Sequence, residues 1–258
     1  MLKTKLFPTV TVFLLIFSSV FAQGEKRLRI GEQPVYKVKK TNGPIIIDGK
    51  LDDLPWKNAE VQNFKYFYRR EKAPDKQESE FRMMWDNENL YLFYDFRDTS
   101  LTSRETNLDG KPYLDDCIEF YCLPVPDSIN MHFAFEINIW KKPFDFVILW
   151  QYHNGKHVNI KAYNPVYKIE VTYEGTINND KDKDSGWRME LAIPFTAFSD
   201  FYNVNPAKAG ARWAFQAVRQ DRNFVDDKFR STSTLFPIYD IFKDVHQPSR
   251  FGICEFIE

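Results

Sequence analysis

Short segments that alternate apolar and polar residues fill most of the chain, and turn-forming residues separate them. The pattern is clearest in "SEFRMMWD" and "LYLFYDFRD", which flank a short "NEN" turn and together predict a β-hairpin. Alternation with a period of two places successive side chains on opposite faces of a strand. The spacing therefore predicts an all-β fold, an antiparallel two-sheet β-sandwich, over residues 34–258.

The expected strands leave little room for helix. One or two helical turns are expected in "LDDLPWKNAE" and in "FTAFSDF", and no linker or internal repeat divides the chain. A single domain is therefore expected after the first 33 residues. The strands are expected over residues 34–40, 43–49, 79–86, 90–98, 115–123, 131–140, 144–150, 157–163, 167–175, 187–195, 212–221 and 250–258.

The N-terminus has the three parts of a secretory signal peptide. Lys3 and Lys5 supply the positive start, "VTVFLLIFSSVF" the apolar stretch, and "VFA" the small residues before a cleavage site. The apolar stretch is too short to span a bilayer, and no later segment is expected to span one. We therefore expect a signal peptide at residues 1–22, a loose leader at 23–33, and export to the periplasm or the cell surface.

Charge and aromatic content limit the classes of partner. The formal net charge of −1 falls to −3 once Lys3 and Lys5 leave with the signal peptide. Neither nucleic acid nor an anionic membrane surface is therefore an expected partner. The 24 Phe, 13 Tyr and 6 Trp residues can supply a large core and also flat rings that stack on ligands.

The three cysteines do not indicate a disulfide framework. Cys117 and Cys122 lie on one expected strand, and a separation of five residues puts them on opposite faces. Because the number of cysteines is odd, at least one thiol has no cysteine partner within the chain. We expect buried free thiols, and a bond from Cys254 to one of the other two remains the alternative.

The stretch "IIIDGKLDDLPW" combines an apolar run, an Asp-Gly turn, two further acids and a tryptophan. An EF-hand calcium loop needs acids at alternating positions, a glycine at the sixth and a glutamate at the twelfth, and this spacing does not fit. A tight turn explains Asp48 and Gly49. It does not explain the acids or Trp56 that follow it.

Five motifs in a fixed order make the chain resemble the family 9 carbohydrate-binding modules. They are "IDGKLDDLPWKNAE", "FRMMWDNENLYLFYDFRD", "YLDDCIEFY", "GWRMELAIPFTAF" and "HQPSRFGICEF". The resemblance covers residues 34–258. It implies a β-sandwich of that family's type, Trp56 as a buried core residue, and an oligosaccharide or polysaccharide as the partner.

The resemblance also implies a sugar site, because two tryptophans sandwich the terminal sugar in sugar-binding members of the family. Tyr113 stands at the first ring position and Glu119 at that of an acidic hydroxyl partner. The second ring position holds Val245, and the adjacent His246 is the expected replacement. Apolar pyranose faces stack on rings, whereas desolvated hydroxyls need directed hydrogen-bond partners.

Two further positions bear on this site. Arg219 in "VRQDR" is expected to line the same mouth, and a family arginine position holds Glu136 here. The Glu136 and Val245 departures leave a second interpretation open, in which the chain is a structural or interaction module that has lost the sugar site. Each ligand candidate also has a purely structural interpretation, for example an ion pair between Arg219 and Asp221.

Calcium is the structural ion that the resemblance implies. Calcium binds several oxygen atoms from carboxylates and carbonyls. The resemblance brings together the strand ends that hold Asp98, Asp115 and Asp116. The polar tip "NNDKDKDSG" offers Asp182 and Asp184 as a second candidate, although the lysines between them favour a solvated loop.

Known catalytic motifs are absent from the sequence. It contains no G-x-S-x-G elbow and no H-E-x-x-H helix motif. The family resemblance, together with this absence, makes non-catalytic glycan binding that supports saccharide breakdown the expected function. The alternatives are a hydrolase of O-glycosyl bonds and the structural or interaction module described above. A haem-binding sandwich of the DOMON type is a further alternative, which rests on Met83, Met84, Met131 and His132.

Signal-peptide cleavage is directly testable. The exported protein should begin at Gln23, because the cleavage site ends at Ala22. The intact mass of the exported protein measures this, and a mass that still includes residues 1–22 would contradict the predicted export route.

Overall fold

The computed structural model describes most of the chain after the predicted leader. The described residues are 33–68, 76–126, 131–153, 156–200, 207–225, 230–238 and 244–258. The predicted signal peptide (1–22), and the predicted leader except for its last residue, lie outside them. None of the helices in these ranges combines the length and the apolar character that a membrane crossing requires.

The described residues form fourteen strands and four short 3₁₀ helices. The strands are β1 (Val35–Lys40), β2 (Gln62–Asn63), β3 (Tyr66–Tyr68), β4 (Ser79–Trp85), β5 (Asn89–Arg97), β6 (Cys117–Leu123), β7 (Met131–Asn138), β8 (Pro143–His153), β9 (Lys156–Ile160), β10 (Lys168–Glu174), β11 (Gly186–Pro194), β12 (Arg212–Asp221), β13 (Ser231–Thr234) and β14 (Gly252–Ile257). The helices are η1 (Leu54–Asn58), η2 (Pro112–Leu114), η3 (Phe195–Phe198) and η4 (Pro248–Arg250). The all-β prediction is confirmed, and η1 and η3 lie within the two segments predicted to hold a helical turn.

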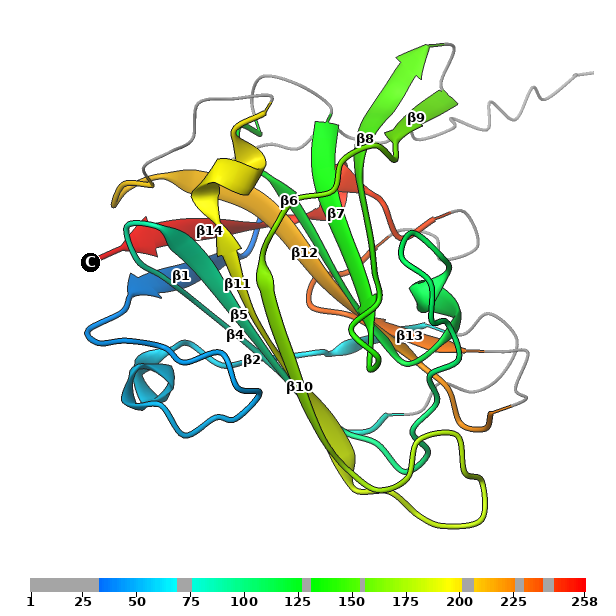
Figure 1. Ribbon diagram of the computed structural model, residues 1–258. Coiled ribbons are helices and arrows are strands. Elements are labelled where there is room, and N and C mark those ends of the chain that lie inside the picture. The colour runs from blue at the N-terminus through cyan, green and yellow to red at the C-terminus, as the bar shows by residue number, and fades with distance from the viewer. Residues whose placement is uncertain are drawn as a thin grey trace, which may run out of the picture.

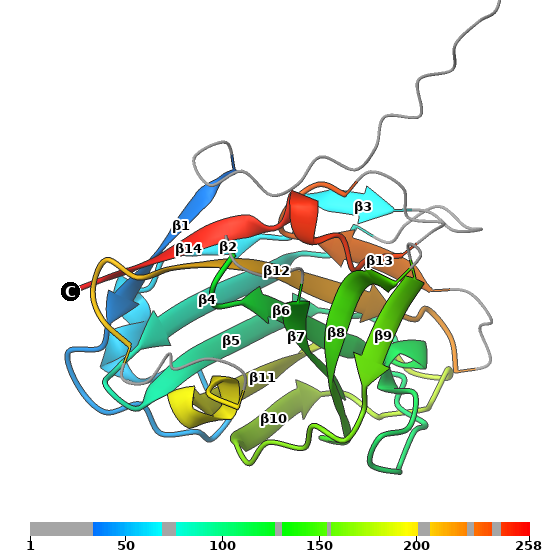
Figure 2. The same ribbon diagram turned by 90° about the horizontal axis from the view of Figure 1, so that it is seen from above.

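The strands form one continuous, curled sheet (Figures 1 and 2). Its path runs β10-β11-β5-β4-β1-β14-β12-β6-β7-β8-β9, and β2, β3 and β13 pair along its side. The antiparallel prediction is wrong at β1, which pairs in parallel with both β14 and β4. These three strands are far apart in the chain, so no hairpin turn fixes their relative direction. The predicted two-sheet sandwich is not confirmed, because the described strands form one mixed sheet along a single path.

The curl of the sheet encloses an aromatic core. The ring of Phe81 on β4 lies 6.5 Å from that of Phe120 on β6 and 6.1 Å from that of Phe215 on β12. All three side chains are fully buried. All three cysteines are also buried and free, as predicted. The packing of rings from strands on either side of the β1–β14 pair holds the sheet in its curled form.

The predicted strand at residues 43–49 is wrong, because the segment pairs with no neighbouring strand. Carboxylates take the N–H groups that a neighbouring strand would otherwise bind. Asp53 Oδ2 accepts the Ile46 N–H at 2.6 Å, and Glu190 Oε2 accepts those of Asp48 and Gly49 at 2.9 Å. The segment therefore lies over the outer face of β4, β5 and β11.

Glu190 on β11 also fixes the tryptophan of this segment. Its Oε1 accepts the indole N–H of Trp56 at 2.9 Å, and Trp56 packs edge-on against Phe93 with ring centroids 5.4 Å apart. Trp56 is 2% exposed, which confirms its prediction as a core residue. Gly49 has φ +76°, a conformation that favours glycine at this turn.

Removal of the Glu190 carboxylate should destabilise the fold. Glu190→Ala leaves three donors near the core unpartnered, and the expected loss in the free energy of unfolding is about 3–5 kcal/mol. Glu78→Ala, at an exposed glutamate just before β4, should change stability by no more than about 0.5 kcal/mol. Urea denaturation of both variants measures the difference, and equal midpoints would contradict the role given to Glu190.

Candidate functional site

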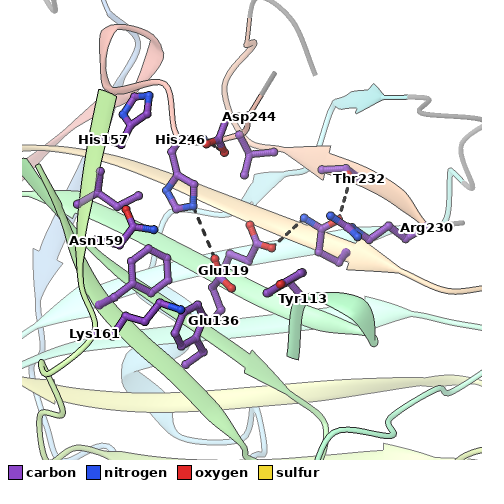
Figure 3. Close-up of a pocket in the computed structure, with 15 residues that line it drawn as sticks. Tyr113, Glu119, Glu136, His157, Asn159, Lys161, Arg230, Thr232, Asp244 and His246 are labelled. Atoms are coloured by element: carbon purple, nitrogen blue, oxygen red, sulfur yellow. Dashed lines mark hydrogen bonds and ion pairs between the residues drawn. The ribbon is translucent and has the colours of Figure 1, made fainter. Parts of the chain in front are cut away.

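A pocket of about 830 Å³ lies on the face of β6, β7 and β8 that points away from the aromatic core (Figure 3). Alternation along each strand sends neighbouring side chains to opposite faces, one toward the core and the next toward the pocket. On β6, Ile118 and Phe120 enter the core, whereas Glu119 lines the pocket. On β7, Ile137 enters the core and Glu136 lines the pocket. The face of Glu119 is the one that the two-residue period predicted.

One wall of the pocket is apolar. Phe144, Phe146 and Ile148 alternate along β8 and line the pocket from one side. The rings of Phe144 and Phe146 lie 4.6 Å apart, and Val245 packs against the same cluster. This wall supplies the apolar surface that ring faces of a ligand would contact.

The opposite wall and the rim are polar. Figure 3 shows Asn159 on β9 and Lys161 just after it at one side, and Arg230 and Thr232 at the other. Tyr113 on η2 lines the pocket, and the Arg230 guanidinium lies 5.6 Å from the centre of its ring. The pocket therefore combines flat rings with convergent hydrogen-bonding groups, as small-molecule sites do.

Hydrogen bonds hold Glu119 in the floor of the pocket. Gln220 Nε2 donates to Glu119 Oε1 at 2.8 Å, and the Tyr121 hydroxyl donates to Oε2. The Gln220 side-chain oxygen accepts from Arg230 Nε at 2.9 Å and from Thr232 Oγ1 at 2.7 Å. These two donors fix the amide orientation, so Gln220 must present its N–H to Glu119.

A second carboxyl group, Glu136, stands beside Glu119 and has fewer partners. His246 Nε2 lies 3.7 Å from Glu136 Oε1, and the other His246 ring nitrogen is hydrogen-bonded to His132 at 2.9 Å. Glu136 Oε2 has no hydrogen-bond partner among the described residues. Burial lowers the pKa of His246, and burial also lowers that of His132 well below its usual range, so both rings are neutral near pH 7.

Three of the four predicted ligand-binding residues meet at this pocket. Tyr113, Glu119 and His246 line it, but Arg219 does not. Arg219 is 2% exposed and points to the core face of β12, because it is one residue from the pocket-facing Gln220. The predicted pairing of Arg219 with Asp221 is present, at 3.2 Å.

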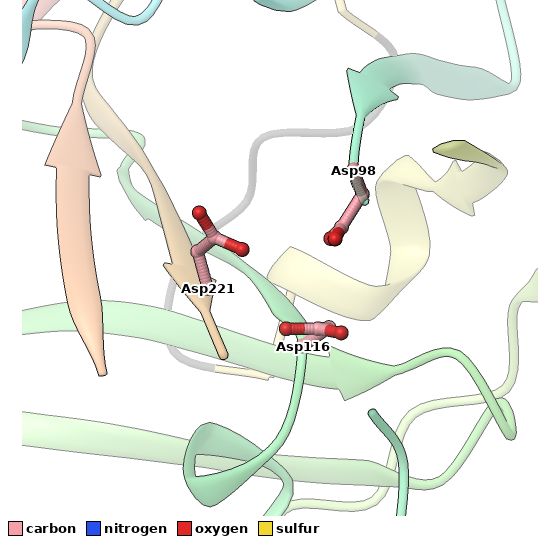
Figure 4. A group of neighbouring side chains, drawn as sticks. All are labelled: Asp98, Asp116 and Asp221. Carbon is pink, nitrogen blue, oxygen red and sulfur yellow. The ribbon is translucent and has the colours of Figure 1, made fainter. Parts of the chain in front are cut away.

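Three buried aspartates meet at one end of the core (Figure 4). Asp98 follows β5, Asp116 precedes β6 and Asp221 ends β12, and one oxygen of each lies within 4.8 Å of the others. We call this set the acidic cluster. Burial raises the pKa of Asp116 well above its usual range, and the charges of Asp98 and Asp221 raise it further. The cluster therefore attracts positive charge.

Arg219 supplies part of this charge. Its Nη2 lies 3.0 Å from Asp98 Oδ2 and 3.2 Å from Asp221 Oδ1. The Asp116 oxygens accept backbone N–H groups from Thr102 and Arg222 at 2.6 and 2.7 Å. Three carboxylates thus surround one guanidinium that contacts two of them, and the spacing of their oxygens also fits a hard cation.

The predicted metal residues are only partly brought together. Asp98 and Asp116 are in the acidic cluster, but Asp115 Oδ2 instead accepts the backbone N–H groups of Arg104 and Glu105 at 2.9 and 2.8 Å. The second candidate pair is also separate, because Asp184 is buried and accepts the backbone N–H groups of Leu101 and Thr176, whereas Asp182 is exposed.

The residues considered for haem do not converge. Met83 and Met131 pack in the aromatic core, and Met84 lies under the 43–59 segment. His132 is on the pocket side of β7, where it bonds His246. These methionines are core residues, which is the usual role of methionine on a strand.

Some pocket residues were not predicted from the sequence. They include Phe144, Phe146, Arg230 and Asp244, and also Gln220. The alternation in "FDFVILW" puts Phe144 and Phe146 on one face, but it does not show which face a pocket would occupy.

A comparison with family models identifies one family. The model described as "Carbohydrate family 9 binding domain-like" matches residues 47–258. A structure of a putative carbohydrate-binding protein from Bacteroides uniformis ATCC 8492 is similar at TM-score 0.69 and 18% identity, and the match covers 87% of this chain and 99% of that one.

Two similar structures are of a family 9 carbohydrate-binding module from Caldicellulosiruptor kristjanssonii. The complex with cellotriose has TM-score 0.57, 18% identity and coverage of 86% of this chain and 93% of that one. The complex with glucose has TM-score 0.56 and 18% identity, with coverage of 85% and 95%. At this identity the likeness shows the fold.

A curated relative is the endo-1,4-beta-xylanase A of Thermoanaerobacterium saccharolyticum. It is 26% identical over 164 residues, which cover 61% of this chain and 11% of the enzyme. The chain thus matches about a tenth of the enzyme's length.

Proposed function

Because the chain belongs to the carbohydrate family 9 binding domain-like family, we propose that its pocket binds a saccharide and that the protein has no catalytic role. The observation that carries this proposal is the composition of the pocket. An apolar wall of Phe144, Phe146 and Ile148 stands beside a floor of buried carboxyl groups. Sugar rings have apolar C–H faces and directed hydroxyls, and this arrangement matches both.

The pocket keeps aromatic rings although the second tryptophan position of the family holds Val245. Val245 lines the pocket where the family resemblance places a ring, and Phe144 and Phe146 supply aromatic surface from β8. This observation favours sugar binding over a module that has lost its site. The related structures that hold cellotriose and glucose make these two sugars the first probes.

The proposed setting is outside the cytoplasm. The signal-like N-terminus, with Lys3 and Lys5 before an apolar stretch, supports export. The partial match to a xylanase supports a role beside enzymes that break down polysaccharides. In this proposal the protein holds a glycan or a glycan end, and other proteins cleave it.

The main rival is a hydrolase that uses Glu119 and Glu136. Glycoside hydrolases place two carboxyl groups on either side of the scissile bond, and this chain has two in one pocket. Incubation of cellotriose with purified protein separates the proposals, because a hydrolase releases glucose whereas a binding module leaves the trisaccharide intact.

Calcium binding is a second proposal, and it concerns the acidic cluster. Asp98, Asp116 and Asp221 offer closely spaced oxygens, and one arginine contacts two of their three carboxylates. A calcium ion at this position would join the ends of β5, β6 and β12. Its contribution is structural, because these residues lie apart from those that line the pocket.

Mutation of Tyr113 tests the sugar site. Tyr113→Ala should weaken binding of a bound glycan at least tenfold, about 1.4 kcal/mol, because a stacked ring is commonly an affinity hot spot. Tyr173→Ala removes an exposed tyrosine on β10, outside the pocket, and should leave affinity unchanged. Calorimetric titration measures both variants. Unchanged affinity in folded Tyr113→Ala would show that the ligand binds elsewhere.

Calcium should raise the melting temperature if it binds the acidic cluster. A ligand that binds only the folded state at a hundredfold excess over its Kd stabilises by about 2.7 kcal/mol, or about 5–10 °C for this chain length. Asp116→Asn should abolish the shift. Melting curves of metal-free protein in EDTA and in calcium measure it, and identical curves would show that Arg219 alone balances these carboxylates.

A further inference from the structure

Glu119 and Glu136 form a carboxyl pair in the pocket floor. They are directly opposite each other on the antiparallel strands β6 and β7, and both line the pocket. Opposite residues have Cβ atoms about 4.5–5.5 Å apart, and like charges there destabilise the strand pair. The two residues are only 1% and 4% exposed. The pair therefore needs either a counter-charge or a proton.

The surrounding groups do not supply a full counter-charge. The groups that face the pair are Tyr121 on β6, His132 on β7, His157 on β9 and Lys161 just after it, Tyr113 on η2, Arg230 beside β13, and Asp244 and His246 before η4. Arg230 donates its Nε–H to Gln220 and lies over the Tyr113 ring, and Lys161 Nζ lies over the Phe144 ring, 5.1 Å from its centre. His246 is neutral, and Asp244 adds negative charge. A shared proton is the remaining way to keep both carboxyl groups buried.

The hydrogen bonds distinguish the two carboxyl groups. Glu119 accepts from Tyr121 and from Gln220, whose amide cannot turn without losing the Arg230 and Thr232 contacts. Two donors stabilise the ionised form of Glu119. Glu136 Oε2 is buried, lacks a partner among the described residues and belongs to a side chain that lines the pocket. From that oxygen, a protonated Glu136 can donate a hydrogen bond to a ligand.

We infer that Glu119 and Glu136 hold one proton between them at neutral pH, and that the pair binds two neighbouring hydroxyl groups of a neutral sugar. Glu136 donates its O–H to one hydroxyl oxygen, and the Glu119 carboxylate accepts from the next hydroxyl. This inference rests on the proposed function and names the sugar groups that the pocket floor recognises. Burial raises the pKa of Glu136 to about 8, and burial followed by the Glu136 charge raises that of Glu119 to about 7.

Binding measured against pH tests the ligand half of the inference. Cellotriose affinity should fall at least tenfold between pH 7.5 and pH 9.5 in the wild type, because the shared proton is lost. Glu136→Ala should lose at least tenfold at pH 7.5. Glu136→Gln should recover most of that loss, since the amide still donates, and should show no fall at high pH. Glu88→Gln, at an exposed glutamate in the β4–β5 turn, should behave as the wild type.

Thermal melting without sugar tests the proton half. A carboxyl group with a raised folded-state pKa stabilises the fold below its unfolded pKa, and this stability is lost as pH rises through the folded value. The melting temperature of the wild type should therefore fall more steeply from pH 5 to pH 9 than that of Glu136→Gln. Glu88→Gln should keep the wild-type slope.

The two measurements separate the ways in which the inference can fail. Equal slopes of melting temperature against pH in wild type and Glu136→Gln would overturn the shared proton. A reduced slope in Glu136→Gln, with no binding of cellotriose or glucose at any pH, would overturn the sugar half and count against the proposed function. Sugar binding that does not depend on pH would overturn the donor role of Glu136. A Glu136→Gln variant whose affinity stays as low as that of Glu136→Ala would overturn it as well.

Discussion

The pleat of β6, β7 and β12 is the constraint on which both the core and the pocket depend. Each strand sends alternate residues to opposite faces, so Phe120 and Phe215 reach the enclosed core while Glu119 reaches the pocket. A shift of one residue in the pairing would exchange these sets and bury charge among the rings. The aromatic core therefore fixes the register that brings the carboxyl groups together, and stability and binding surface come from the same strands.

The fold balances buried carboxyl groups in two ways. In the acidic cluster, Arg219 contacts Asp98 and Asp221, so a fixed cation offsets part of the negative charge. At the pocket floor, Glu119 and Glu136 have no such ion pair with an arginine or lysine among the described residues. A proton balances that pair in our account, and the protonated carboxyl group can donate a hydrogen bond to a ligand's hydroxyl group. The first arrangement suits a structural role and the second suits binding.

The sequence predicts the elements of this fold better than their arrangement. Local alternation predicts the β4–β5 hairpin and the pocket face of Glu119. The family resemblance predicts that Trp56 is buried and that Tyr113 lies beside Glu119, where it lines the pocket. Long-range contacts decided the rest. The side chain of Glu190, far along the chain, turns the predicted strand at 43–49 into a covering segment. The sequence predicts Arg219 at the pocket, but Arg219 lies on the core face of β12. Its face depends on the pairing of β12 with β6, which the local sequence does not specify.

Amide chemical-shift mapping with a neutral oligosaccharide tests the central claim, that the pocket on β6 to β9 is where sugar binds. On addition of cellotriose, saturable shifts should gather at Tyr113, at Glu119 and Glu136, and along the Phe144–Ile148 wall. The apolar groove around Ile45 and Val166, on the far side of the sheet path, should not respond. Saturable shifts centred on that groove, or none at the pocket with any neutral oligosaccharide in a broad panel, would contradict the account.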